Sequence, residues 1–479
     1  MGAEPLTLMA HQREGVDFLL ARRAGIIAFE QGLGKTLVAI EAFRRLHRAG
    51  AVRGMLVLCP NSLKRTWAAE LERFAPDLDV ELIEGARAER RSTLGRTVAT
   101  VILVNYEAAR NEITSIRGML ARRGTVLVLD ESHYIKNFRS LNSIAAQHFA
   151  PLSEYRWLLT GTPVTNQATD IYPQICVAAA GEPFGSHASF EARYGGKDLG
   201  GRARESLAEK IRPFLLRRTK EECLDLPPKL FEDVTVDLPR WQRKLYEAVR
   251  DGVAAEVDSI PPEDFHRYLP TGLVRLLRLS QVASNPGLVF PDERRVPGKF
   301  AHLDRTVDEL VEAGRKVIVW SYYVDTIRLL EARYRKCGSA ALYGGIDPRD
   351  RHSIAARYQE DPNLRVLVAN PAAAGTGLTL TAANYSVYET VTWRYDQYAQ
   401  SQDRNHRIGQ TVPVTYIRLL AADTIEFAIL EALSRKARLA QDLIDGDVDD
   451  TFPLKLTRRS FTELLQTGRL PASTEGLGP

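Results

Sequence analysis

The sequence has few cysteines and no long apolar run, and both absences argue against particular classes of protein. Its four cysteines, at positions 59, 176, 223 and 337, form no C-x-x-C pair. This spacing argues against a zinc site and favours a reducing compartment, where thiols stay unpaired. The longest apolar runs, such as residues 101–104, have the length of a strand and fall well short of the ~18 residues of a membrane span.

A targeting segment and a strong excess of one charge are missing as well. The opening stretch, MGAEPLTLMAHQ, has no basic segment followed by an apolar one, so we expect no signal peptide. We therefore expect a protein of the cytoplasm (of a prokaryote or a viral host) or of the nucleus, with no membrane partner. The formal net charge is only +4, a mildly basic balance that permits nucleic-acid binding without indicating it.

Strand-like apolar runs alternate with helical patterns in two parts of the chain. The first part holds GIIAF, GMLVLCP, VATVILVNY, TVLVLDE and RWLLTG, and the second, from residue 315, holds RKVIVWSYY, SAALYGG, RVLVAN, YSVYET and VTYIRLLA. Near-continuous apolar strands separated by helices predict parallel sheets covered on both faces. Between the two parts, LPPKL and VTVDLP are extended, while RWQRKLYEAVRDGVAAEV and GLVRLLRLSQVA predict helices. Because 479 residues are too many for one core, we expect an α/β protein of two lobes with a helical segment between them.

The stretch FEQGLGKT, residues 29–36, has the layout of a phosphate-binding loop. It follows an apolar run and precedes a helical pattern, although Phe29 stands where G-x-x-x-x-G-K-[ST] has a glycine. Gly32 and Gly34 allow successive N–H groups to point at an anion, and a helix beginning near Thr36 adds its dipole. Lys35 can reach the terminal phosphates, and the Thr36 hydroxyl can ligate Mg²⁺. The alternative is a tight turn between strand and helix that carries a solvated lysine.

Two adjacent carboxylates end another apolar run. In VLVLDESHYIKN, Asp130 and Glu131 follow a predicted strand, and ligands bind at the carboxyl ends of parallel strands. Asp130 is suited to hold Mg²⁺ through water, and Glu131 to orient the attacking water as a base. Taken alone, the pair could equally be solvated turn carboxylates. Combined with FEQGLGKT in the same lobe, the two motifs predict nucleotide hydrolysis.

These motifs resemble helicase superfamily two and, more narrowly, the Swi/Snf family of ATP-driven DNA translocases. LMAHQREGVDFLL resembles the adenine-reading segment, FEQGLGKT the first motif, whose opening glycine the family often lacks, and DESHYIKN the DEAH box, with Ser132 in place of alanine. RWLLTGTPVTNQATDIY resembles the third motif, while AAAGTGLTLTAAN and QSQDRNHRIGQTVPV resemble the motifs of the second lobe. The resemblance implies RecA-like lobes at residues 1–230 and 301–445, a helical linker or protrusion at 231–300, and a C-terminal tail at 446–479.

The same resemblance implies the residues of the site, with ATP in the cleft between the lobes. ATP would be held by Gln12, Gly32, Leu33, Gly34, Lys35, Thr36 and Gly377, with Mg²⁺ on Thr36 and Asp130. Hydrolysis would use Lys35, Asp130, Glu131 and two arginine fingers of the second lobe, Arg404 and Arg407. DNA phosphates would lie near Ser62, Lys64, Asn105, Tyr106, Thr160, Thr162 and Thr376.

The leading hypothesis is a DNA-dependent ATPase that moves along double-stranded DNA as a monomer and remodels protein–DNA or DNA structures. Contacts to the DNA backbone carry no sequence information, so binding should be sequence-independent and salt-sensitive. Two alternatives are a helicase that separates strands and a nucleotide-gated DNA clamp with little turnover. The arginine clusters 44–45, 87/90/91, 122–123 and 217–218 are either a steering surface for DNA or plain solvated faces. The sequence indicates no particular protein partner.

Overall fold

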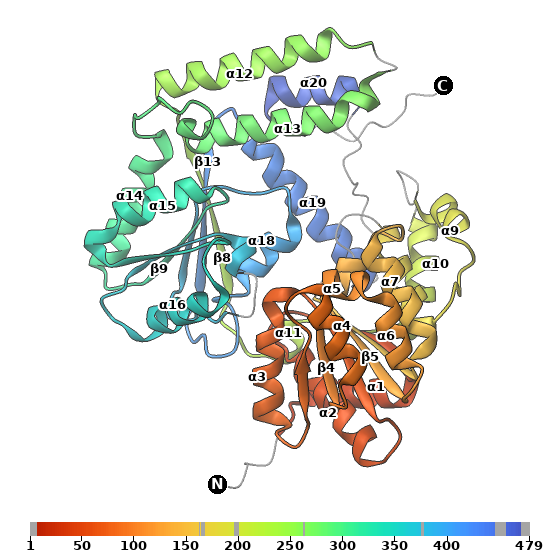
Figure 1. Ribbon diagram of the computed structural model, residues 1–479. Coiled ribbons are helices and arrows are strands. Elements are labelled where there is room, and N and C mark those ends of the chain that lie inside the picture. Colours follow the sequence, from red (N-terminus) through yellow and green to blue (C-terminus); the bar gives the residue numbers. More distant parts are fainter. Residues whose placement is uncertain are drawn as a thin grey trace. The chain divides into compact units, whose positions relative to one another are not determined.

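The chain forms two α/β units that separate between Asp225 and Leu226, and residues 438–445 near its C-terminal end group with the first unit. Figure 1 shows the helices and strands of both units. The computed structural model describes residues 7–161, 163, 168–195, 201–261, 264–374, 378–445 and 457–470. Three predicted site residues, Thr162, Thr376 and Gly377, lie outside the described residues. Unit 1 carries the FEQGLGKT and DESH motifs, and unit 2 carries the HRIG motif.

The apolar runs of unit 1 form a seven-stranded parallel sheet in the order β3-β4-β2-β5-β6-β1-β7. Successive residues of a strand point to opposite faces, and both faces are apolar: Leu127 packs in one core, whereas Val126 and Val128 pack in the other. This two-sided burial explains why the strands are continuous apolar runs. The strands are β1 (Ala24–Phe29), β2 (Gly54–Cys59), β3 (Val80–Leu82), β4 (Val101–Asn105), β5 (Thr125–Asp130), β6 (Tyr155–Leu159) and β7 (Leu215–Arg218).

Helices cover both faces of this sheet. Val38 and Phe43 of α2 join the core on one face, and Ile175 of α8 joins the core on the other. The helices of unit 1 are α1 (Ala10–Arg22), α2 (Lys35–Arg48), α3 (Lys64–Phe74), α4 (Arg87–Arg96), α5 (Tyr106–Asn111), α6 (Ile113–Leu120), α7 (Leu141–Phe149), α8 (Tyr172–Ala179), α9 (His187–Tyr194), α10 (Gly201–Ile211) and α11 (Lys220–Cys223).

A six-stranded parallel sheet forms unit 2, in the order β10-β11-β9-β12-β13-β8. Here too the strands are covered on both faces, with Ile318 in one core and Val317 and Val319 in the other. The strands are β8 (Lys229–Val236), β9 (Val317–Trp320), β10 (Ser339–Leu342), β11 (Val366–Ala369), β12 (Tyr385–Tyr388) and β13 (Val414–Ala421).

The helical segment of unit 2 is a layer to which the end of the chain contributes. Helices α12 and α13 lie side by side and α20 packs with them (Figure 1). Phe461 of α20 is fully buried, and its ring centroid lies 5.7 Å from that of Phe265 and 6.4 Å from that of Tyr268, both on α13. The helices of unit 2 are α12 (Arg240–Asp258), α13 (Phe265–Ser284), α14 (Gly298–Glu312), α15 (Val324–Arg333), α16 (Pro348–Glu360), α17 (Pro371–Ala374), α18 (Tyr395–Gln402), α19 (Glu426–Asp445) as far as residue 437, and α20 (Arg458–Thr467).

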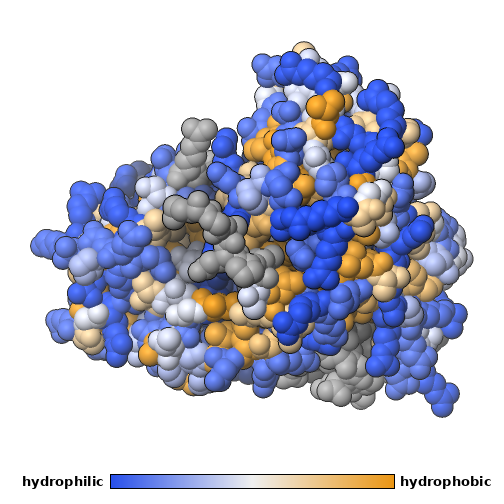
Figure 2. Space-filling model, turned by 90° about the horizontal axis from the view of Figure 1, so that it is seen from below, coloured by the Kyte–Doolittle hydropathy of each residue, from blue (hydrophilic) through white to orange (hydrophobic). Residues whose placement is uncertain are grey.

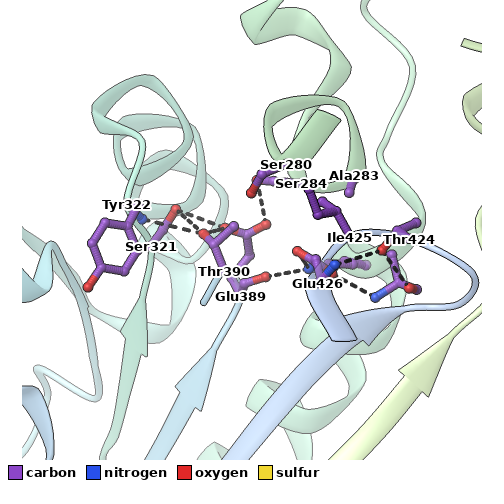
Figure 3. A network of polar contacts seen from close by, with 12 residues as sticks. Ser280, Ala283, Ser284, Ser321, Tyr322, Glu389, Thr390, Thr424, Ile425 and Glu426 are labelled. Atoms are coloured by element: carbon purple, nitrogen blue, oxygen red, sulfur yellow. Dashed lines mark hydrogen bonds and ion pairs between the residues drawn. The ribbon is translucent and has the colours of Figure 1, made fainter. Parts of the chain in front are cut away.

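A buried polar network joins this helical layer to the sheet of unit 2 (Figure 3). The Glu389 carboxylate, just after β12, accepts hydrogen bonds from Ser284 of α13 at 2.7 Å and from Ser321 at 2.8 Å. Lys299 of α14 donates to the Glu389 carbonyl at 2.8 Å and pairs with Glu426 of α19 at 2.5 Å. Burial raises the pKa of Glu426, while the charge of Lys299 lowers it. The network therefore fixes three helices to the carboxyl ends of β9 and β12.

The two sheets and their flanking helices confirm the expected α/β fold class. The strands β3 and β7 were not expected. The segment after LPP, which was expected to be extended, forms β8 and pairs along its whole length with β13 of the second sheet. Most of β8 is exposed or half-buried, so its sequence has no strong apolar pattern.

Among the described helices, none is long and apolar enough to cross a membrane. The face in Figure 2 is mostly hydrophilic, with apolar residues gathered in patches.

Candidate functional site

The phosphate-loop geometry of unit 1 depends on its two glycines. Gly32 has φ +89° and Gly34 has φ +79°, a region that residues with a Cβ rarely adopt. A Cβ on Gly34 would also lie 2.5 Å from Nε2 of Gln12. Lys35 is the first residue of α2, and its Nζ donates to the Phe29 carbonyl at 2.9 Å. The ammonium group therefore lies within the curl of the loop, and Thr36 follows it in the first turn of α2.

Helix α1 supports the loop from behind. His11 Nε2 lies 3.0 Å from the Leu33 carbonyl, and Gln12 Nε2 donates to the same oxygen at 3.3 Å. The other end of the Gln12 amide accepts a bond from the Met9 N–H at 3.0 Å and so closes the start of α1. Both side chains are buried. The glutamine expected to read adenine is therefore also a spacer between α1 and the phosphate loop.

The carboxylate of Asp130 lies at the end of β5 and is held from two sides. It accepts hydrogen bonds from the Trp67 indole N–H at 2.7 Å and from the Glu131 N–H at 2.9 Å. Burial, followed by the charge of Glu131, raises the pKa of Asp130 to about 6, although Trp67 and Lys35 lower it. Trp67 is buried in the core, and its N–H has a polar role that the sequence does not indicate.

The structure brings the two sequence motifs together. Gln31 of the phosphate loop donates to Glu131 at 3.4 Å, and His133 Nδ1 lies 3.3 Å from the other oxygen of Glu131. Gly161 of the third motif also lies close to the phosphate loop: a Cβ there would lie 3.2 Å from the Gln31 side chain and 3.7 Å from Lys35 Nζ. Three segments far apart in the sequence therefore meet around one point at the carboxyl end of the sheet.

A buried hydrogen-bond relay connects the carboxylates to the third motif. The Ser132 hydroxyl donates to Gln174 Oε1 at 2.6 Å, and Gln174 Nε2 donates to the Pro163 carbonyl at 2.6 Å. Both side chains are fully buried. Sequence reasoning missed Gln174, although a single amide in the otherwise apolar helix YPQICVAA is a usable signal, because a buried amide needs partners.

Arg217 of β7 has a role in the site that its sequence pattern did not indicate. It lies opposite Ala28 in the register of β1 and β7, and donates to the carbonyls of Ala28 at 3.0 Å and Gly161 at 3.3 Å. It also pairs with Glu30 at 3.3 Å. The Arg217–Arg218 pair was expected to be a steering surface or a solvated face. Instead, Arg217 joins the end of β1 to the third motif.

The residues expected to contact DNA differ in accessibility. Ser62 and Asn105 are half-buried at the carboxyl ends of β2 and β4, while Lys64 is buried and pairs with Glu84 at 3.1 Å. The Tyr106 side chain is buried and donates to the Asp130 carbonyl at 2.8 Å, so it supports the carboxylates and does not face solvent. Thr160 is also buried, at the end of β6.

The two arginines of unit 2 follow helix α18. Arg404 is buried, and its Nε donates to the Gln400 carbonyl at 3.1 Å. Arg407 is half-buried and donates to the Leu378 carbonyl at 3.4 Å. Gln410, three residues on, donates to the carbonyls of Thr381 and Asn405 and so folds the HRIGQ loop on itself.

A family model described as SNF2-related domain matches residues 11–287, and another, described as helicase conserved C-terminal domain, matches residues 298–409. The chain belongs to the SNF2-related family. The first match covers more than half of the chain and includes the phosphate loop, the DESH segment and the third motif. The resemblance inferred from the motifs is thereby confirmed.

Relatives of this SNF2-related chain carry names that agree with an ATP-dependent motor. An uncharacterized ATP-dependent helicase of Mycoplasma pneumoniae is 29% identical over 96% of this chain and 44% of its own length. The putative ATP-dependent helicase/translocase YwqA of Bacillus subtilis is 29% identical over 92% of this chain and 49% of its own length. The chain thus spans about half the length of these relatives. A solved structure titled Sulfolobus solfataricus SWI2/SNF2 ATPase core in complex with dsDNA is 26% identical over 98% of both chains, with a TM-score of 0.43.

Proposed function

We propose that this SNF2-related chain is an ATP-driven motor that moves along double-stranded DNA as a monomer and remodels protein–DNA or DNA structures. The observation that carries the proposal is the contact between Gln31 and Glu131, 100 residues apart, at 3.4 Å. It joins a phosphate loop to a pair of carboxylates, and phosphoryl transfer to water needs both. Membership of a family of ATP-dependent helicases and translocases supports the same reading.

The nucleotide would be bound by the loop and the helix that follows it. The N–H groups around Gly32 and Gly34 and the start of α2 would receive the phosphates, because this backbone presents donors to an anion. Lys35 Nζ, which donates to the Phe29 carbonyl, would exchange that partner for a phosphate oxygen. Gln12 would meet the adenine ring at the back of the loop.

Mg²⁺ fits the oxygen donors that lie nearby. The Thr36 hydroxyl and the Asp130 carboxylate are the hard ligands that this ion prefers. The raised pKa of Asp130 indicates that its negative charge is costly without a cation, and a bound cation would offset that cost. When bound, the ion would neutralise charge on the transferring phosphoryl group. Glu131, held by Gln31 and close to His133, would orient the attacking water and accept its proton.

Arg404 and Arg407 of unit 2 are proposed as arginine fingers. A guanidinium keeps its charge at all relevant pH values and offers a planar fork of donors to phosphoryl oxygens. Both side chains are already oriented by backbone carbonyls, which lowers the entropy lost on binding. If the assignment is right, Arg404→Ala and Arg407→Ala lower kcat by ~10³-fold or more while ATP affinity changes much less. Unchanged turnover in both variants would show that the arginines are structural only.

The proposed track is the backbone of duplex DNA. Ser62 and Asn105 are half-buried at the carboxyl ends of β2 and β4, where their polar groups could reach phosphates, and Lys64, Tyr106, Thr160, Thr162 and Thr376 stay predicted contacts. The side chains of Lys64, Tyr106 and Thr160 are buried in this structure, so contacts through these residues would require the loops around them to open. Contacts to phosphates do not distinguish one base from another, so we expect sequence-independent binding that weakens as salt rises. The Swi/Snf resemblance favours moving along a duplex over unpairing it.

Two experiments test the proposal. Lys35→Ala should lose ATP binding or turnover, whereas Glu131→Gln should bind ATP without hydrolysing it; wild-type hydrolysis by Glu131→Gln would refute the assigned base. The track is tested by displacement of a third strand from a DNA triplex, measured beside unwinding of a forked duplex. Triplex displacement without fork unwinding, and stronger stimulation by duplex than by single strands or RNA, are expected. Fork unwinding with an intact triplex would indicate a strand-separating helicase, and DNA binding without stimulated hydrolysis a clamp.

A further inference from the structure

Three arginines of α4 converge on one buried carboxylate of unit 1. Arg90 and Arg91 pair with Glu112 at 3.2 and 2.9 Å, and Arg87 Nε lies 3.7 Å from the same group. The Glu112 side chain is fully buried between α5 and α6, whereas those of Arg87 and Arg91 are 64% and 54% exposed. Arg87, Arg90 and Arg91, here called the arginine cluster, thus place three positive charges around one negative charge.

The position of the arginine cluster adds to its surplus of positive charge. All three residues lie in the first half of α4, near the helix end that carries the positive pole of the dipole. Cations are unfavourable there and anions favourable. Glu89 of the first turn offsets part of the charge, but its carboxylate also accepts the Ala86 N–H at 2.8 Å and closes the helix start. The surplus of charge therefore favours a bound anion.

The exposed arginines are oriented so that their outer donors stay available. Arg91 uses Nε for Glu112, and the contact of Arg87 with Glu112 also involves Nε. Arg87 and Arg91 make no other polar contact to the described residues. The terminal nitrogens of a guanidinium form a fork that matches a phosphate group. Anchoring of the side chains on Glu112 reduces the entropy that phosphate binding would cost.

The arginine cluster lies at the edge of the sheet where DNA contact is proposed. Strands β3, β4 and β2 are parallel neighbours, so the loops that follow them meet along one edge of the sheet. The loop after β3 leads into α4, Asn105 is the last residue of β4, and Ser62 lies in the segment after β2. Glu84, just before α4, contacts Lys64 at 3.1 Å and Arg65 at 3.6 Å and so links the loop after β3 to α3.

We propose that the arginine cluster is a further DNA-binding surface, which extends contact with the phosphate backbone from the loops of β2 and β4 to the edge strand β3. The proposal rests on the proposed DNA motor and adds phosphate contacts outside its sequence motifs. Arg87 and Arg91 would each neutralise one phosphate, while Arg90, which is mostly buried and also donates to the Gly85 carbonyl, would hold the cluster together.

The test compares two double variants that remove the same charge. Arg87→Gln/Arg91→Gln removes the exposed arginines of the cluster and leaves Arg90 and Glu112 paired. Arg45→Gln/Arg48→Gln removes two arginines of α2 whose side chains are 45% and 61% exposed. The dissociation constant for a duplex of random sequence is measured in the full chain over a range of salt concentrations.

Loss of two phosphate contacts should make the slope of log affinity against log salt shallower by about 1.8. If both proteins bind equally at 1 M salt, this change makes the variant bind ~60-fold more weakly than the wild type at 0.1 M salt. The Arg45→Gln/Arg48→Gln control should keep the wild-type slope. The slope does not depend on the fraction of folded protein, so partial unfolding cannot imitate the result. An unchanged slope in Arg87→Gln/Arg91→Gln, or equal losses in both variants, would overturn the assignment and leave the motor function standing. A wild type that neither binds duplex nor is stimulated by it would overturn both.

Discussion

Replacement of Asp130 by asparagine should remove a loss of stability that the nucleotide-free wild type suffers as the pH rises towards neutrality, while abolishing hydrolysis. The pKa of Asp130 is raised from 3.8 to about 6 because burial and the charge of Glu131 disfavour the ionised form more than Trp67 and Lys35 favour it. A raised pKa in the folded state means that the folded protein binds the proton more tightly than the unfolded chain. The stability from this group is therefore complete below pH ~3.8 and is lost as the pH rises through ~6.

The size of the stability change follows from the shift in the pKa of Asp130. About two pKa units correspond to ~3 kcal/mol over the whole titration, of which ~1.4 kcal/mol is lost between pH 5 and pH 7.5. Asparagine has no charge to bury, so the Asp130→Asn variant escapes this loss. Its amide can accept only one of the two bonds that Asp130 receives from Trp67 and Glu131. That cost does not depend on pH, so the change in stability with pH isolates the carboxylate.

The assay is denaturant-induced unfolding of both proteins in EDTA at pH 5 and pH 7.5. The stability of Asp130→Asn relative to the wild type should increase by ~1.4 kcal/mol between these values. Asp77→Asn is the control. Partial burial raises the pKa of Asp77, but its own backbone amide, Arg44 and Arg48 lower it more, so the group titrates below the measured range. If Asp130→Asn and the wild type lose stability in parallel between pH 5 and pH 7.5, ionisation of the Asp130 carboxylate does not destabilise the folded protein.

Three further variants test contacts that only the structure shows. Trp67→Phe removes the N–H that lowers the pKa of Asp130, so the acid limb of the ATPase–pH profile should move up by ~1–2 pH units. This size is expected for loss of a charged hydrogen bond of ~1.5–3 kcal/mol. An acid limb that does not move would argue against Asp130 as the titrating group. Ser132→Ala leaves Gln174 Oε1 buried without its donor and should cost ~1–3 kcal/mol of stability in denaturant unfolding. The double variant Ser132→Ala/Gln174→Met should lose less stability than the sum of the two single variants. Additive losses would show that the pair is not coupled. Lys299→Met leaves the buried Glu426 carboxylate without its cation and should lower stability by ~3–5 kcal/mol, which is measured as a lower Tm. An unchanged Tm would mean that the Lys299–Glu426 pair is energetically neutral.

The features that depend on short-range chemistry could be predicted from the amino-acid sequence. Ten apolar runs predict ten of the thirteen strands found in the described part of the chain, because a strand buried on both faces must be apolar along its whole length. The phosphate loop was equally predictable, since Gly32 and Gly34 occupy backbone conformations that few other residues tolerate. Asp130 and Glu131 could be placed at the carboxyl end of a strand for the same local reason.

Contacts between groups far apart in the sequence could not be predicted and became visible in the folded chain. Strand β8 is mostly exposed or half-buried, so its place beside β13 comes from backbone pairing that leaves little trace in the side-chain pattern. The partners Trp67 of Asp130 and Gln174 of Ser132 are 63 and 42 residues away. The arginines of α4 become a cluster through Glu112, more than twenty residues further along the chain. Periodicity and turn chemistry act over a few residues, whereas these contacts arise when a parallel sheet brings the ends of distant strands to one edge.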